Sequence, residues 1–328
     1  MRGRYLTPDP LGLRAGSNAY SYVQANPLKY IDPSGLVLFA FDGSGNDRHD
    51  GALYSDVVRF FQLYEDRSFY ISGVGTKDDD TGIAPASTDP KGLADIASAY
   101  TGKARITAMI DKLNRYSNSI NDDTIFNIDI VGFSRGAAEA RDFANQLVEK
   151  YKDGYYRYKN DSGAEQCQKV NFNFMGLFDT VLSTHTGEYQ LSIPDTFTYV
   201  AQAMALNEYR GGAVAFPMES IRGAPTPINA TRIERGFLGA HSDIGGGYPD
   251  GNLAKVALNW MVEQANLAGV KMGDESTLHT MIANPVIHDA SSNLISGADE
   301  GGRRQLAKIA TFATEMGPLR NNARQHWP

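Results

Sequence analysis

The chain has 328 residues, of which 42% are hydrophobic and 21% charged, and its formal net charge is −7 at pH 7. These values are typical of a globular protein of one or two domains, and the acidic balance argues against nucleic acid as a partner. The sequence has no run of about 18 apolar residues that could span a membrane, and its single cysteine, Cys167, excludes an internal disulfide and a thiolate metal site.

The first 36 residues differ from the rest of the chain in composition. They hold several prolines and tyrosines and show no helical period, which predicts short strands and turns without a core of their own. The start of the chain also lacks the apolar core of a secretory signal, so we expect any export to use another route.

Three stretches of this first segment carry a resemblance to a known family. Residues 3–13 read GRYLTPDPLGL, residues 18–22 read NAYSY, and residues 27–36 read PLKYIDPSGL. They resemble the last repeat of the Rhs/YD-repeat core and its P-x4-D-P-x-G-L boundary motif. In that family a large β-cocoon encloses a variable C-terminal toxin, and the chain cuts itself after the final leucine.

The resemblance implies two units, with residues 1–36 as the end of an Rhs core and residues 37–328 as an effector domain. It further implies autocleavage between Leu36 and Val37, with Asp32 in the cleavage motif, and an Rhs shell as a partner. The alternative interpretation is a linker built of Pro and Gly turns.

After residue 36, short apolar runs alternate with segments of helical period. The predicted strands are 37–41, 69–74, 125–131, 170–178 and 233–238, and the predicted helices are 53–64, 104–113, 137–151 and 253–267. This alternation predicts an α/β fold with a mainly parallel sheet and helices on both faces. Catalytic residues are then expected on loops beyond the carboxyl ends of the strands.

One such strand end carries the sequence GFSRG at residues 132–136, directly before a predicted helix. A serine between two glycines on a strand-to-helix turn is the layout of a nucleophile elbow. A match of this length can arise by chance, but its position in the predicted fold favours Ser134 as the nucleophile of a serine hydrolase.

Two other strand ends supply an acid and a base. Asp179 follows the strand 170–178, and His241 follows the strand 233–238, which gives the chain order serine, acid, histidine. The histidine would take the serine proton, and the aspartate would orient the imidazole. Each residue also has a plain structural reading: a turn or helix-capping aspartate, or a buried hydrogen-bonded imidazole.

His288 is the rival base, because it could follow a last strand of the sheet. Asp243 would then be the acid, although it could instead brace the glycine-rich loop that follows it. The sequence favours His241 and Asp179 but leaves this alternative open.

The oxyanion hole is expected to combine the backbone N–H of Arg135 with one from the loop at Gly43 and Ser44. Glycine lets the backbone of such a loop approach a substrate closely. Phosphate binding by the loop is disfavoured, since no G-x-x-x-x-G-K-[ST] string is present.

Four motifs together resemble a second family. They are FDGSGN at 41–46, GFSRGA at 132–137, GLFDTV at 176–181 and GAHSDIGGGY at 239–248. They are similar to the motifs of type VI secretion lipase effectors with an uncharacterised α/β-hydrolase domain, the DUF2235 group. The resemblance implies a phospholipase whose serine, aspartate and histidine map onto Ser134, Asp179 and His241.

The resemblance also implies a route and partners. A type VI effector would leave the cell by contact-dependent secretion on a spike, act in the periplasm or membrane of a target cell, and be neutralised by a cognate immunity protein. Two segments could contact lipid: the polar loop 76–91, and residues 197–216, as a lid or, equally, as a helix packed on the sheet. Arg135 and Arg210 are candidate contacts for a phosphate headgroup, with solvated arginines as the alternative.

The sequence therefore predicts a phospholipid ester hydrolase of phospholipase A type that needs no cofactor and no metal. The alternatives are a serine hydrolase acting on cell-wall esters or amides, and a non-catalytic binding module carried by an Rhs protein.

Overall fold

The computed structural model describes residues 35–49, 53–89, 91–98, 100–120, 124–182, 189–208, 210, 216–217, 219–224, 226–249, 253–273 and 285–288. The Rhs-like stretch up to residue 34, including Asp32, lies outside the described residues. Leu36 is the first residue of strand β1 and is buried. A cut between Leu36 and Val37 would therefore fall inside a strand of the sheet.

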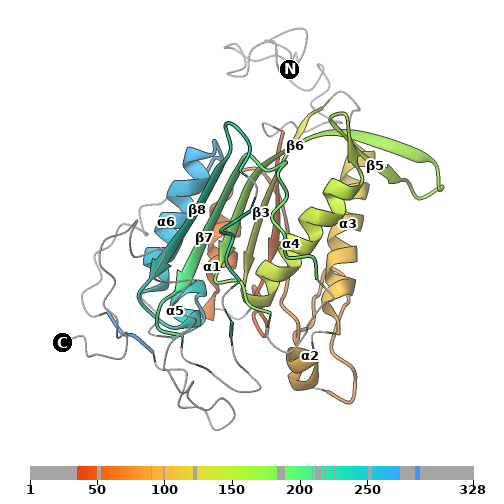
Figure 1. The fold of residues 1–328 in the computed structure, drawn as a ribbon. Coiled ribbons are helices and arrows are strands. Elements are labelled where there is room, and N and C mark those ends of the chain that lie inside the picture. Colours follow the sequence, from red (N-terminus) through yellow and green to blue (C-terminus); the bar gives the residue numbers. More distant parts are fainter. Residues whose placement is uncertain are drawn as a thin grey trace, which may run out of the picture.

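One eight-stranded sheet forms the centre of the molecule (Figure 1). The strands are β1 (Leu36–Phe41), β2 (Arg67–Ile71), β3 (Phe126–Phe133), β4 (Tyr151–Lys152), β5 (Tyr155–Lys159), β6 (Glu165–Phe178), β7 (Tyr199–Ala205) and β8 (Thr231–Phe237). β2, β1, β3, β6, β7 and β8 are neighbours in that order, and all of these pairs are parallel. β4 and β5 extend the first part of β6 as an antiparallel ribbon.

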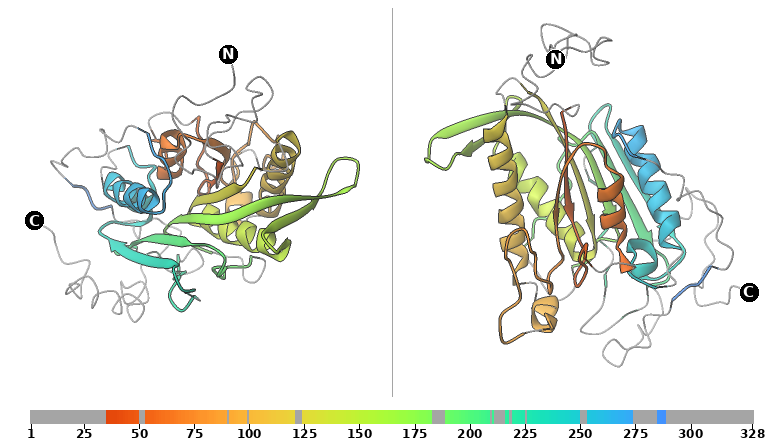
Figure 2. Two further views of the ribbon diagram at one scale, coloured as in Figure 1. Left: turned by 90° about the horizontal axis from the view of Figure 1, so that it is seen from above. Right: turned by 180° about the vertical axis from the view of Figure 1, so that it is seen from behind.

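Helices cover both faces of the sheet (Figure 1, Figure 2). They are α1 (Asp56–Leu63), α2 (Leu93–Ser98), α3 (Gly102–Ser119), α4 (Ser134–Glu149), α5 (His241–Gly245) and α6 (Ala254–Leu267). α3 and α4 pack on one face, while α1 and α6 pack on the other. The short helices α2 and α5 lie at the end of the sheet where the parallel strands end. The predicted α/β architecture is confirmed.

The two cores explain why β1 is apolar at every position. Val37, Phe39 and Phe41 point into the core under α3 and α4, and the alternate residues Leu38 and Ala40 point into the core under α1 and α6. A strand that is buried on both faces has no solvent-exposed face that needs polar side chains, so its sequence is a continuous apolar run. Each fully buried phenylalanine or leucine side chain contributes about 1.5–3 kcal/mol to folding.

Residues 199–205, in the middle of the segment 197–216, do not form the helix that their sequence pattern predicts. Residues 199–205 are strand β7, which is inserted between β6 and β8 and is almost entirely buried. A short apolar run rich in alanine is ambiguous between helix and strand, and its neighbours in the sheet decide the outcome. The lid interpretation is thus wrong for residues 199–205, and residues 211–215 lie outside the described part.

Within the described ranges, no helix combines the length and the apolar character that crossing a membrane requires.

Candidate active site

The elbow at Ser134 has the backbone that its sequence predicts. β3 ends at Phe133, and α4 begins at Ser134. Ser134 has a backbone φ of 58°, a value that residues other than glycine rarely adopt. A Cβ on Gly132 would lie 2.7 Å from the Cα of Ala137, and one on Gly136 would lie 2.2 Å from the carbonyl oxygen of Asp42. Gly132 therefore lets α4 turn back closely on β3, and Gly136 lets α4 pack closely against the end of β1.

Ser134, His241 and Asp179 form one hydrogen-bonded chain. Nε2 of His241 lies 2.7 Å from Oγ of Ser134, and Nδ1 of His241 lies 2.6 Å from Oδ2 of Asp179. The three residues are only 8%, 4% and 1% exposed, respectively. This order of atoms is the one that a serine, base and acid require for proton transfer.

The carboxylate of Asp179 is held by the neighbouring strand. Asp179 follows β6 with a φ of 42°, and its backbone N–H donates to the carbonyl of Ala203 at 2.7 Å. Its Oδ1 accepts from the backbone N–H of Ala205 at 2.9 Å. Oδ2 remains for the imidazole, so β7 sets the direction in which the carboxylate faces.

The imidazole of His241 lies in an apolar setting. His241 begins α5, and its ring lies 4.7 Å from the ring of Phe133 and 4.7 Å from that of Phe216, measured between centroids. Burial lowers the pKa of His241 below its ordinary value near 6.5, and the hydrogen bond to Asp179 opposes this shift. The imidazole is consequently neutral near pH 7 and can accept a proton from Ser134.

The loop after β1 lies against the elbow, as expected for part of an oxyanion hole. A Cβ on Gly43 would lie 2.6 Å from the ring of Phe133. The N–H of Gly43, however, donates to Oδ1 of Asp42 at 2.7 Å. No described residue accepts the N–H of Ser44, which makes Ser44 the better partner for the N–H of Arg135 in the first turn of α4.

Asp42 itself is a structural anchor of that loop. Its Oδ2 accepts from the hydroxyl of Tyr70 at 2.7 Å, and burial raises the pKa of Asp42 to about 6. The carboxylate thereby ties the loop to β2.

The rival pair lies elsewhere in the site. Nδ1 of His288 lies 2.6 Å from Oδ1 of Asp243, and the imidazole stacks on Tyr248 with 3.8 Å between centroids. Oδ2 of Asp243 accepts from the backbone N–H groups of Ala240 and His288. Asp243 and His288 thus brace the loop that carries His241, and His241 is the histidine that reaches Ser134.

The two candidate headgroup arginines differ in their contacts. The guanidinium of Arg135 donates to the carbonyl of Ile96 in α2, whereas that of Arg210 pairs with the buried carboxylate of Glu208 at 2.8 Å.

Sequence reasoning missed two residues that hold the loop of His241. Asn207 exchanges hydrogen bonds with Gly239: its N–H donates to the carbonyl of Gly239, and its Oδ1 accepts the N–H of Gly239, each at 2.9 Å. Glu208 accepts the backbone N–H of His241 at 3.1 Å. Two polar residues directly after an apolar run that ends at Leu206 are the pattern that could have revealed them.

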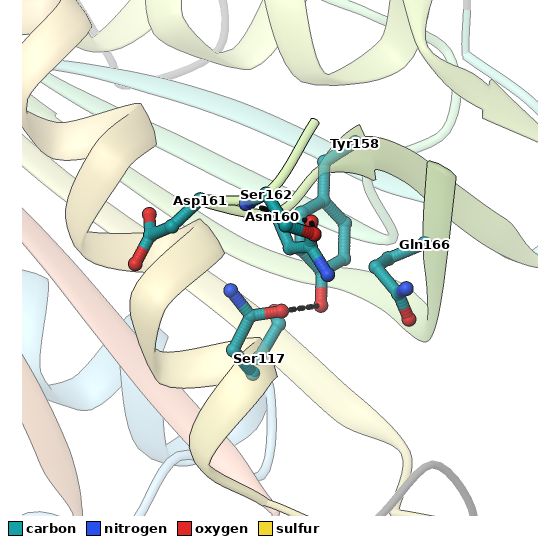
Figure 3. A pocket seen from close by; sticks show the side chains of 7 residues that line it. Ser117, Tyr158, Asn160, Asp161, Ser162 and Gln166 are labelled. Carbon is teal, nitrogen blue, oxygen red and sulfur yellow. Dashed lines mark hydrogen bonds between the residues drawn. The ribbon is translucent and has the colours of Figure 1, made fainter. Parts of the chain in front are cut away.

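A separate hollow lies at the opposite end of the sheet, between α3 and the β5–β6 hairpin (Figure 3). Its lining is polar and consists of Ser117, Asn118, Tyr158, Asn160, Asp161, Ser162 and Gln166. Tyr158 donates to Oδ1 of Asn118 at 2.9 Å across it. This hollow contributes nothing to the site at Ser134. The described residues also contain no group of three or more His, Cys, Asp or Glu side chains able to hold a metal ion.

The chain is similar to several known proteins. Residues 145–264 match the family model of the catalytic domain of Tle1-like phospholipase effectors of the type VI secretion system. This match includes Asp179 and His241 and begins after Ser134.

Two solved structures share the fold. One is an uncharacterized protein from Pseudomonas aeruginosa, with 21% identity and a TM-score of 0.51 over 76% of this chain and 47% of that chain. The other is the Tle1 effector bound to the VgrG spike of the type 6 secretion system, with 18% identity and a TM-score of 0.50 over 88% of this chain and 81% of that chain. The fold is of the α/β-hydrolase type.

A curated relative matches a smaller part of this chain. The uncharacterized protein YEL023C of Saccharomyces cerevisiae is 37% identical over 89 residues, which are 23% of this chain and 13% of the yeast protein. The chain therefore spans less than half of the Pseudomonas aeruginosa chain and a small part of the yeast protein.

Proposed function

We propose that this chain is a phospholipase effector that hydrolyses ester bonds of membrane phospholipids with Ser134 as the nucleophile. The observation that carries the proposal is the hydrogen-bonded chain from Ser134 through His241 to Asp179 on an elbow at the carboxyl end of β3. The match of residues 145–264 to phospholipase effectors supports the lipid substrate.

The reaction would proceed through an acyl-enzyme. Oγ of Ser134 attacks the ester carbonyl while Nε2 of His241 takes its proton, and Asp179 stabilises the imidazolium that forms. The N–H groups of Arg135 and Ser44 would hold the oxyanion of the tetrahedral intermediate.

Collapse of that intermediate breaks the ester bond. The leaving alcohol, a lysophospholipid in phospholipase A chemistry, takes the proton from His241. Water then attacks the acyl-enzyme, with His241 again as the base, and releases a fatty acid and free Ser134.

Delivery is part of the proposal. A relative of the same fold is bound to a secretion spike, which supports contact-dependent secretion with a spike protein as partner. We expect action in the periplasm or membrane of a target cell, and a cognate immunity protein in the producing cell. Residues 1–36 would be the end of an Rhs shell that releases the domain by a cut after Leu36.

Vesicles of phosphatidylethanolamine and phosphatidylglycerol test the reaction, with free fatty acid and lysophospholipid measured by mass spectrometry. The wild-type chain should release both in equal amounts, and Ser134→Ala should lower the rate by at least about 10³-fold. Ser119→Ala, on the exposed end of α3, is the matched control and should retain full activity.

Peptidoglycan is incubated in parallel. Release of cell-wall fragments without lipid products would assign the site to a cell-wall hydrolase. No product from either substrate would favour a non-catalytic binding module.

A further inference from the structure

A buried ion pair lies beside the histidine of the site, on the segment that follows β7. Each carboxylate oxygen of Glu208 accepts two hydrogen bonds. Oε1 accepts from the backbone N–H of Arg210 at 2.9 Å and from its Nε at 2.8 Å. Oε2 accepts from Nη2 of Arg210 at 2.8 Å and from the backbone N–H of His241 at 3.1 Å. Glu208 therefore joins Arg210 directly to the backbone of the base.

The guanidinium makes a second connection to the same histidine. Its central carbon lies 3.6 Å from the centroid of the Phe216 ring, which is the geometry of a cation–π contact. The Phe216 ring in turn meets the imidazole of His241 edge-on, with 4.7 Å between centroids and an interplanar angle of 77°. Arg210 thus contacts the face of a ring that itself contacts the imidazole of His241.

We propose that Glu208 and Arg210 are positioning residues for His241: the carboxylate fixes its backbone, and the guanidinium holds Phe216 against its ring. The inference rests on the proposed function, in which His241 is the base. Neither residue has to touch substrate. Their effect is to keep Nε2 of His241 within reach of Oγ of Ser134, a distance on which the rate of proton transfer depends strongly.

The charges around His241 make this role measurable. Asp179 faces the ring from the end of β6, Ser134 faces it from α4, and Glu208 and Arg210 face it from the segment after β7. Arg210 lowers the pKa of His241 and Glu208 raises it, while burial remains the largest effect. Neutral replacements of the two residues should consequently move the pKa of His241 in opposite directions.

On the other elements nearby, Asp243 is bound to His288. Tyr248 interacts electrostatically with Asp243, Arg210 and Glu208. Both variants of the ion pair keep Asp243, Tyr248 and His288 in place.

The test uses Arg210→Met, Glu208→Gln and the control Arg115→Met, which removes an exposed arginine from α3. The rate at which a fluorophosphonate labels Ser134 is measured against pH, and kcat and KM are measured on a neutral, soluble ester. Arg210→Met should move the acid limb of the labelling profile to higher pH, and Glu208→Gln should move it to lower pH. Each should lower kcat roughly tenfold or more with little change in KM, and the control should match the wild type.

Several results would overturn the inference. These are wild-type labelling rates in both variants, shifts of the acid limb in the same direction, or a loss confined to phospholipid with the neutral ester unaffected. The last result would make Arg210 a headgroup contact instead. If Arg210→Met does not fold, as judged by circular dichroism, Phe216→Leu replaces it, since it removes the ring contact and leaves the ion pair. A wild-type labelling rate in that variant would equally overturn the role of the ring.

Phospholipid hydrolysis is followed in the same preparations. A wild-type chain that is labelled at Ser134 but does not hydrolyse phospholipid would refute the proposed substrate, and the positioning role would still be decided by the labelling profiles.

Discussion

Nε2 of His241 lies 2.7 Å from Oγ of Ser134, although 107 positions of sequence separate the two residues. The parallel sheet accounts for this meeting, because β3, β6 and β8 all end at the same edge. Ser134, Asp179 and the loop of His241 follow these three ends. The insertion of β7 between β6 and β8 sets the spacing that lets one imidazole reach both partners.

Replacing each histidine in turn separates the two candidate bases. His241→Ala should lower kcat/KM by about 10³-fold or more, because the serine would lose its proton acceptor. His288→Asn should lower it less than about tenfold, since it weakens only the bracing of Asp243. Kinetics on a soluble ester, with folding checked by circular dichroism, measure both. An equal loss in two folded variants would contradict the assignment of His241.

The pH dependence of hydrolysis reports the state of His241. Its pKa lies below 6.5 because the ring is buried, so the imidazole stays neutral, and competent as a base, to a lower pH than an exposed histidine would. The rate should be constant around neutral pH and fall only as the pH drops through this lowered value. A profile of kcat/KM against pH measures the midpoint, and a midpoint above 6.5 would contradict the direction of the shift.

Gly136→Ala tests the tight contact at the elbow. The added Cβ would lie 2.2 Å from the carbonyl oxygen of Asp42, and we expect a loss of about 3 kcal/mol in the free energy of unfolding. Gly163→Ala is the control: its Cβ would meet nothing within 4 Å, and only its φ of 81° is unfavourable, which costs about 1 kcal/mol. Urea denaturation measures both, and equal losses would contradict the proposed clash.

Glu139→Gln tests a buried carboxylate on α4 near the nucleophile. Glu139 is 1% exposed, and among the described residues neither of its oxygens has a hydrogen-bond partner. Burial raises the pKa of Glu139 from 4.5 to about 8. In the folded state the carboxyl group therefore keeps its proton at pH values where the unfolded chain has lost it.

The sign of the effect follows from this difference. The wild type loses stability as the pH rises from 4.5 towards 8, and the variant, which has no group to ionise, does not. We expect Glu139→Gln to be more stable at alkaline pH by on the order of 5 kcal/mol and equal to the wild type in acid. Glu263→Gln, on an exposed position of α6, is the control. Parallel stability curves for wild type and Glu139→Gln across pH would contradict the raised pKa of Glu139.

The sequence predicted those parts of the fold that depend on local patterns. β1 and β3 are continuous apolar runs, and the elbow is specified by two glycines whose Cβ atoms would clash. Asp179 and His241 were found because strand ends in a parallel sheet converge. The structure places both beside Ser134, and their catalytic roles remain a proposal.

Other parts depend on contacts that no local pattern encodes. β7 contains Ala201, Ala203 and Ala205, and alanine favours helices. The segment forms a strand because it pairs with β6 on one edge and with β8 on the other. Glu208 accepts the backbone N–H of His241 only because the paired strands β7 and β8 bring the two residues together. The β5 strand was not among the predicted strands, although it alternates buried tyrosines with exposed residues in a period of two.

The most direct test of the triad is to locate the adduct of a fluorophosphonate by mass spectrometry of the digested protein. The wild-type chain should carry one adduct, on Ser134, and His241→Ala should be labelled at least about 10²-fold more slowly. An adduct on another serine, or labelling of Ser134 that does not depend on His241, would contradict the account.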